Sequence, residues 1–234
     1  MWESQRDQIV VSLGSEGESD ILVLPVPARE VDSALSLGGK VIGPRGLSER
    51  GNEGEVVYVQ YEEKSGDSLR RMVRDRYGNG KWTQFFSLAE IISQGGSMSL
   101  DDKLFIFTRA DEKLEILRFE NGVCVEEFRE IRANPRCLLE FQFLRLKSIA
   151  DASYDEDRQT QIKRILLVGE HATQPIISAL FTNIFDLPVY TVFPPFLPTA
   201  HFSDSAQTCL SVPSDDKSPY LMYRSMLREH IRLK

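Results

Sequence analysis

Cysteine is scarce in this sequence, and the few cysteines present are spaced too widely to act together. The 234 residues include three of them, Cys124, Cys137 and Cys209, and no Cys-x-x-Cys pair. An odd number at wide spacings supports neither a disulfide framework nor a structural zinc site. We therefore expect no disulfide and no metal site, and a reducing, cytoplasmic setting.

Positive charge is also in short supply. Lys and Arg number 28 against 35 Asp and Glu, which gives a net charge of −7 and an isoelectric point near 5.2. A protein that binds nucleic acid would show a basic face, as would one that docks on an anionic membrane. The apolar runs fall well short of the roughly 20 residues that a membrane-spanning helix needs, and the first residues lack the pattern of a signal peptide. We expect neither a nucleic acid nor a membrane as a partner.

Histidine is also rare in this sequence. The three histidines, His171, His201 and His230, do not cluster along the sequence. We expect each of them to be a surface or turn residue and not a catalyst. The run from Arg74 to Arg76 is typical of a solvated helix face. We therefore assign no catalytic residue and no metal ligand in this chain.

What the sequence does contain suits a folded domain. It is 41% hydrophobic and 27% charged, which is enough apolar material for a core. Short β-rich runs at 9–13 and 21–24 flank a glycine turn and predict a hairpin that ends at Pro25 and Pro27. The glycine-rich, polar segment 28–55 predicts a flexible loop. The other expected elements of the first half are a strand at 56–61, helices at 68–77 and 82–92, a strand at 104–107 and a hairpin within 116–128 around Asn121-Gly122.

The second half has the clearest pattern. Asn134 and Pro135 predict a helix start, with Asn134 as the cap and Pro135 as the first residue. A buried strand at 164–168, a turn at 169–174, a helix at 175–185 and a strand at 187–192 form a βαβ unit whose turn faces a ligand. A closing helix is expected at 218–232. Antiparallel strands first and α/β order later favour an α/β fold of the ribonuclease-H-like, actin-like ATPase class, with a mixed sheet flanked by helices.

Four stretches, in order, resemble the FGGY carbohydrate kinases, and the eukaryotic xylulokinases in particular. Residues 9–16 are similar to the phosphate motif Val-Ser-Leu-Gly-Thr-Ser, with Gly14-Ser15-Glu16 in place of Gly-Thr-Ser. Residues 165–174 and 187–190 are similar to the adenosine motif Gly-Gly-Ala-Ser-x-Asn and the Ala-Pro-Val-Tyr that follows it. Residues 135–144 are similar to the helix Val-Arg-Ala-Leu-x-Glu-Gly-Gln-Phe. Residues 69–76 with 82–86 are similar to the family's segment after Phe-x-Asn-Gly-Ser-Leu.

The resemblance implies that residues 1–234 form the C-terminal, nucleotide-binding domain of such a kinase. It implies ATP and Mg²⁺ as ligands, held weakly or only as a remnant, and it places the nucleotide at Gly14, Ser15, Gly169, Glu170 and Gln174. In the family the sugar site and the catalytic aspartate lie on an N-terminal domain, further upstream than the 13 residues before Gly14 allow. Asp7 is too near the first strand to be that base. We therefore expect a chain that is inactive alone, whose partner is an N-terminal sugar-kinase half or a second copy of the chain.

The site positions depart from the family pattern. A glycine turn lets backbone N–H groups approach phosphate, but the carboxylates Glu16 and Glu170 repel it. The two segments could equally be a plain hairpin turn and a plain βα turn. The resemblance also brings Glu140 and Gln142 near the cleft; two residues apart on a helix, they do not share a face, and they could be the polar edge of a core helix.

Three functions remain open at this point. The first is half of an enzyme that phosphorylates D-xylulose or a related sugar with ATP. The second is a non-catalytic pseudokinase module that binds or regulates, which Glu16 and Glu170 favour. The third is an unrelated actin-like module.

Overall fold

The structure is a computed structural model of the whole chain. It describes residues 7–14, 18–42, 56–92, 104–109, 114–153, 162–191 and 207–208. The expected closing helix at 218–232 and the residues Ser15 and Glu16 lie outside this part. Within it, no helix is both long and apolar enough to cross a bilayer.

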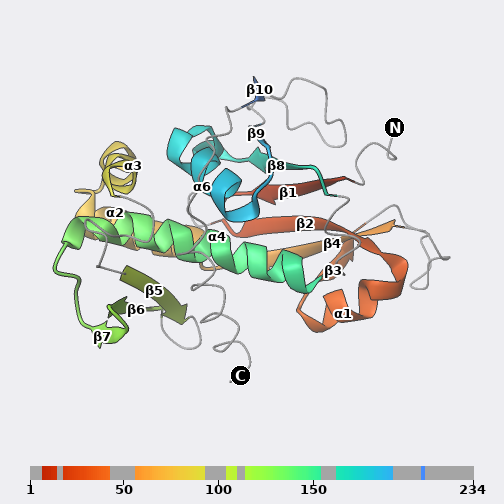
Figure 1. Cartoon of the computed structure of the whole chain (residues 1–234), viewed down its shortest axis with the longest axis horizontal. Coiled ribbons are helices and arrows are strands. Elements are labelled where there is room, and N and C mark those ends of the chain that lie inside the picture. Colours follow the sequence, from red (N-terminus) through yellow and green to blue (C-terminus); the bar gives the residue numbers. More distant parts are fainter. Residues whose placement is uncertain are drawn as a thin grey trace.

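A seven-stranded mixed sheet forms the centre of the molecule (Figure 1). Strands β1, β8 and β9 run parallel to one another, and the remaining pairs are antiparallel. The expected hairpin, third strand and βαβ unit are all present. In spatial order the strands are β10 (Gln207–Thr208), β9 (Val189–Thr191), β8 (Arg164–Val168), β1 (Gln8–Ser12), β2 (Asp20–Pro27), β4 (Val56–Glu63) and β3 (Lys40–Ile42).

A second, three-stranded antiparallel sheet consists of β5 (Leu104–Arg109), β6 (Glu115–Glu120) and β7 (Val123–Val125). The turn between β6 and β7 has positive φ at both central residues, 53° at Asn121 and 80° at Gly122. This is the two-residue hairpin geometry that an Asn-Gly pair favours, so the predicted hairpin is confirmed.

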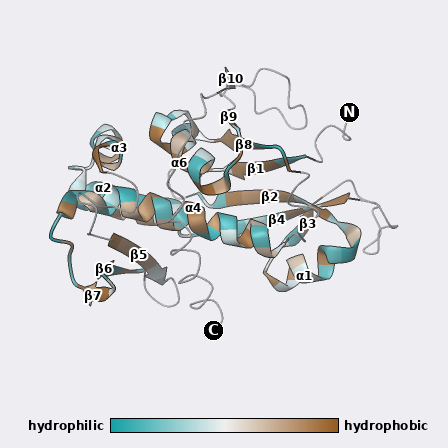
Figure 2. Cartoon of the chain, viewed as in Figure 1, coloured by the Kyte–Doolittle hydropathy of each residue, from teal (hydrophilic) through white to brown (hydrophobic). Residues whose placement is uncertain are grey.

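Helix α4 (Asn134–Ala152) lies between the two sheets (Figure 1). Helices α2 (Gly66–Tyr77), α3 (Trp82–Ile91) and α6 (Pro175–Phe185) pack against α4, whereas α1 (Val31–Ser36) packs on β2, β3 and β4. Hydrophobic residues run along β1, β2 and β8, while α4 mixes hydrophobic and hydrophilic residues along its length (Figure 2). Because neighbours surround α4, most of its residues are buried whatever their polarity.

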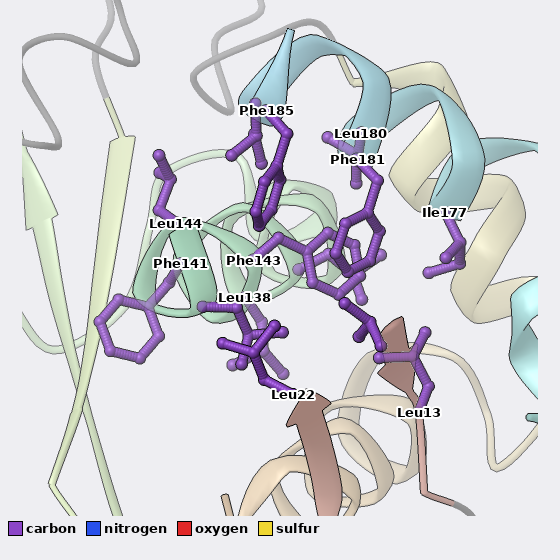
Figure 3. Close-up of a cluster of buried hydrophobic side chains, with 14 of the residues drawn as sticks. Leu13, Leu22, Leu138, Phe141, Phe143, Leu144, Ile177, Leu180, Phe181 and Phe185 are labelled. Atoms are coloured by element: carbon purple, nitrogen blue, oxygen red, sulfur yellow. The ribbon is translucent and has the colours of Figure 1, made fainter. Parts of the chain in front are cut away.

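The core is continuous from the large sheet through α4 to α6 (Figure 3). Phe143 of α4 meets Phe181 of α6, with ring centroids 4.2 Å apart. Leu13 and Leu22 add the ends of β1 and β2 to the same cluster. Aromatic pairs of this kind contribute beyond the area that they bury, so α6, which follows the predicted ligand turn, is firmly anchored.

Three local expectations differ from the structure. The described part of the expected loop 28–55 contains a 3-10 helix, α1 and β3, because Val31 and Ala34 are buried in the core. Pro25 does not end β2; it pairs with Tyr58 of β4, while the pairing of β2 with β1 stops at Val23. Proline lacks an N–H. Because β2 no longer pairs with β1 at Pro25, this missing donor leaves no acceptor of β1 unpaired.

Asn134 is not the cap of α4 but its first helical residue, with Ala133 as the cap. The side chain of Asn134 is occupied elsewhere, since its Oδ1 accepts from Nε of Arg118 at 2.7 Å and its Nδ2 donates to Glu127 at 2.9 Å. Tertiary hydrogen bonds have thus replaced the local capping bond.

Candidate functional site

The structure brings the two predicted ligand turns side by side. Strands β1 and β8 are parallel neighbours, with Ser12 opposite Val168, and N–H of Leu13 donates to the carbonyl of Val168 at 2.9 Å. Gly14 and Gly169 therefore follow the carboxyl ends of adjacent parallel strands. In open α/β sheets this edge is where ligands bind.

Gly169 is fixed by the backbone of the neighbouring strand. Its φ is +114°, and a Cβ atom at this position would overlap the carbonyl oxygen of Leu13. Only glycine fits this conformation without strain. The backbone of Gly169, which we expected to face a nucleotide, therefore packs on this side against the end of β1.

Glu170 and Gln174 lie at the two ends of the segment that follows. Glu170 begins the 3-10 helix Glu170–Thr173, and its side chain is exposed. Gln174 is half-buried and caps α6 without a side-chain hydrogen bond to the helix. An exposed carboxylate and a side-chain amide thus precede α6. The negative charge of Glu170 would repel a phosphate bound here.

Gly14 is engaged within the chain. Its N–H donates to Oδ1 of Asp20 at 2.9 Å, and its carbonyl accepts from Nη2 of Arg70 at 3.0 Å. The amide expected to face a phosphate is thus bound to a carboxylate of the chain itself. Ser15, the other predicted phosphate contact, lies outside the described residues.

Asp20 and Arg70 form a buried ion pair that the sequence reasoning missed. Nη1 and Nη2 of Arg70 donate to Oδ2 and Oδ1 of Asp20 at 2.7 and 2.8 Å, and the two side chains are 1% and 3% exposed. Arg70 follows Leu69 on α2, and the apolar positions of that helix gave no sign that an arginine would be buried beside them. The pair ties the start of β2 and the Gly14 turn to α2.

Gln142 joins this pair, whereas Glu140 does not. Oε1 of Gln142 accepts from Arg70 at 3.2 Å, and its Nε2 donates to the carbonyl of Gly66 at 2.9 Å. Glu140 instead accepts from Nε of Arg136 at 2.6 Å. The two residues indeed have different surroundings, but both are buried, so neither forms an exposed edge of the helix.

His171 lies in the turn, which agrees with the expectation of a surface or turn residue, but it is buried and not at the surface. It is 3% exposed, and its ring lies 4.2 Å from that of Trp82 and 5.4 Å from that of Phe86. Burial, and then the charge of Arg70, lower the pKa of His171 below its ordinary value. His171 thus holds the ligand turn against α3 as a neutral, aromatic side chain.

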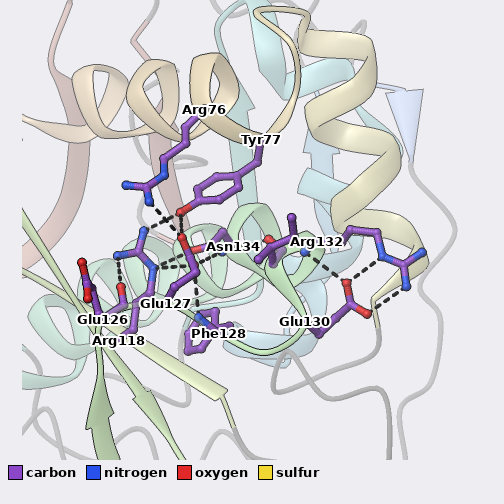
Figure 4. Close-up of polar contacts among 10 residues, drawn as sticks. Arg76, Tyr77, Arg118, Glu126, Glu127, Phe128, Glu130, Arg132 and Asn134 are labelled. Atoms are coloured by element: carbon purple, nitrogen blue, oxygen red, sulfur yellow. Dashed lines mark hydrogen bonds and ion pairs between the residues drawn. The ribbon is translucent and has the colours of Figure 1, made fainter.

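A separate polar network joins α2, the small sheet and the start of α4 (Figure 4). The hydroxyl of Tyr77 donates to Glu127 at 2.5 Å and accepts from Nη2 of Arg118 at 2.9 Å. Burial and the bond to Glu127 raise the pKa of Tyr77 to about 12. A hollow of about 390 Å³ borders this network, between α2 and β6. Because the charged groups of the network bind one another, we regard it as structural.

Magnesium in nucleotide sites is usually held by one or two carboxylates together with the phosphates. Among the described residues, no three His, Cys, Asp or Glu side chains lie close enough to hold a metal ion. The two turns offer two exposed carboxylates among the described residues, Glu18 beside Gly14 and Glu170 after Gly169. Magnesium would therefore have to arrive with the phosphates of the nucleotide, which would supply most of its ligands.

No family model and no curated protein match the sequence. The fold, however, matches solved sugar kinases. A ligand-bound xylulose kinase from Lactobacillus acidophilus, 12% identical, has a TM-score of 0.59 over 97% of this chain and 47% of its own. A xylulose kinase from Rhodospirillum rubrum, 11% identical, has a TM-score of 0.54 over 98% and 46%. A glycerol kinase from Plasmodium falciparum, solved with ADP, is 13% identical, with a TM-score of 0.54 over 81% and 36%.

At these identities the likeness concerns the fold, and it confirms the expected class, an actin-like α/β domain with a mixed sheet flanked by helices. The chain spans less than half the length of each of these three kinases.

Proposed function

We propose that this chain is the nucleotide-binding, C-terminal half of a sugar-kinase-like protein. The observation that carries the proposal is the pairing of the Gly14 and Gly169 turns at the carboxyl ends of parallel strands β1 and β8. Such an edge offers backbone groups to a nucleotide, and the whole chain follows the fold of sugar kinases that are about twice as long.

The ligand is ATP or ADP with magnesium, bound weakly. Two features weaken the binding of the nucleotide. The amide of Gly14 already donates to Asp20, and Glu170 adds an exposed negative charge at the second turn. Phosphoryl transfer to D-xylulose or a related sugar then requires a sugar-binding half with a general base, because catalysis of this kind consists of positioning and charge stabilisation across both halves.

The nucleotide proposal is tested by calorimetric titration of the wild type and Glu170→Gln with MgADP and MgATP. Two unit charges about 4 Å apart interact by roughly 4 kcal/mol at an effective dielectric of 20, and solvent and magnesium reduce this to about 1 kcal/mol. We expect Glu170→Gln to bind about fivefold more tightly. Asp32→Asn removes the same charge from an exposed position on α1 and should leave the affinity unchanged. Tight binding by the wild type that Glu170→Gln weakens would make Glu170 a ligand residue and contradict this account.

The second candidate is a non-catalytic pseudokinase that binds or regulates a partner. The bond from Gly14 to Asp20 favours it, since that bond withdraws a phosphate contact. The same titration separates the two candidates. If neither nucleotide binds the wild type or Glu170→Gln, even at millimolar concentration, the nucleotide proposal fails and the pseudokinase remains.

A further inference from the structure

The carboxylate of Asp20 sits among donors that would suit a bound anion. The N–H of Gly14 and both terminal nitrogens of Arg70 point at its two oxygens, at 2.7 to 2.9 Å. Backbone amides and a forked guanidinium are the groups that proteins use for carboxylates and other oxyanions. The whole arrangement is removed from water, which strengthens each contact.

The surrounding chain leaves room for this group and little more. A Cβ atom on Gly66, the first residue of α2, would overlap Oδ2 of Asp20. Gln142 bridges the two sides, because it accepts from Arg70 and donates to the carbonyl of Gly66. A small hollow lined by Asp20, Gly66 and Gln142, among others, borders the carboxylate.

We propose that the N–H of Gly14 and the guanidinium of Arg70 form an anion site that the chain fills with its own Asp20, so that these donors are withdrawn from an external phosphate and accept a small carboxylate only when Asp20 is removed. The ligand class follows from the space, which fits a planar carboxylate group. This inference does not rest on the nucleotide proposal, because it concerns an internal contact and needs no ATP.

The test compares Asp20→Ala with Asp20→Asn in sodium formate and in sodium chloride at equal ionic strength. Asp20→Ala removes only the carboxylate and leaves a space the size of formate beside an unpaired, buried Arg70. We expect its Tm to fall by about 10 °C in chloride, as for other broken buried ion pairs. Formate at about ten times its dissociation constant should return about 4 °C.

Asp20→Asn is the matched control. It also loses the charge, but its amide fills the space, so its Tm should fall without any return in formate. Asp20→Ala combined with Arg70→Met should likewise show no effect of formate, because the guanidinium is gone. Wild type should be indifferent to the choice of salt.

Two results would overturn the proposal. One is an Asp20→Ala chain that responds equally to formate and chloride; the other is an equal response to formate in Asp20→Asn. If Asp20→Ala does not fold in chloride, the two salts are compared by whether the chain folds in each of them, as measured by circular dichroism. Folding in formate alone supports the anion site, and no folding in either salt counts against it.

Discussion

At the scale of single residues, the turn glycines serve packing as well as any ligand. The sequence predicts bare backbone for a nucleotide at Gly169, and the structure places this residue directly after β8. The sequence could not reveal that the end of β1 already approaches this backbone, because the contact depends on the register of two strands far apart in the chain. The buried contacts of Asp20, Arg70 and His171 were not predicted, because they also join segments that are far apart in the chain.

Gly169→Ala is therefore expected to act on stability before it acts on binding. The new methyl group meets both a positive φ and the carbonyl of Leu13, so we expect a loss of about 3 kcal/mol in the free energy of unfolding. Gly38→Ala is the control, since Gly38 has a φ of +87° but no heavy atom within 4 Å of the place that the methyl group would take. It should cost about 1 kcal/mol. Urea denaturation of the wild type, Gly169→Ala and Gly38→Ala measures the two losses of stability. Equal losses in the two variants would refute the packing argument.

His171 makes the stability depend on pH. Its pKa is lowered in the folded chain, so the unfolded chain takes up the proton more readily. The folded state should therefore lose stability as the pH falls below the ordinary value of 6.5 and towards the lowered pKa. Arg70 adds to this effect, while the carboxylates of Glu170, Asp67 and Asp20 oppose it.

The measurement compares wild type with His171→Phe, which keeps an aromatic ring against Trp82 and Phe86. Urea midpoints are taken at about pH 7.5 and about pH 5.5, on either side of the ordinary histidine pKa. The drop between the two pH values should be smaller in the variant. Since both proteins share all other titrating groups, an equal drop would show that His171 does not carry the effect.

At the scale of elements, periodicity and turn chemistry predicted nearly every strand and helix that the structure describes. The Asn121-Gly122 turn and the βαβ unit at 164–191 follow from local rules that tertiary structure did not override. Helix α1 and strand β3 were missed because they are short and lie in a glycine-rich segment, so their formation depends on the burial of Val31 and Ala34. Helix and strand propensities describe only the local sequence and cannot predict such burial.

At the scale of the whole molecule, the nucleotide site that we propose occupies one edge of the large sheet. Both turns lie at one edge of the sheet, and the described residues opposite them contribute packing and ion pairs within the same domain. Under our proposal the two turns position a nucleotide, and among the described residues we assign no general base for a sugar hydroxyl.

We accordingly expect the 234-residue chain alone to show no sugar-dependent turnover with D-xylulose and MgATP. A general base alone contributes roughly 10²- to 10⁴-fold, and the positioning of a bound sugar contributes more. The assay couples ADP release to a spectroscopic signal, with and without the sugar. Gly169→Ala, purified in the same way, is the control for contaminating kinases, because a contaminant gives equal rates in both preparations. A sugar-dependent rate that is present in the wild type and lost in Gly169→Ala would show that this half carries the whole reaction, and the two-half account would have to be abandoned.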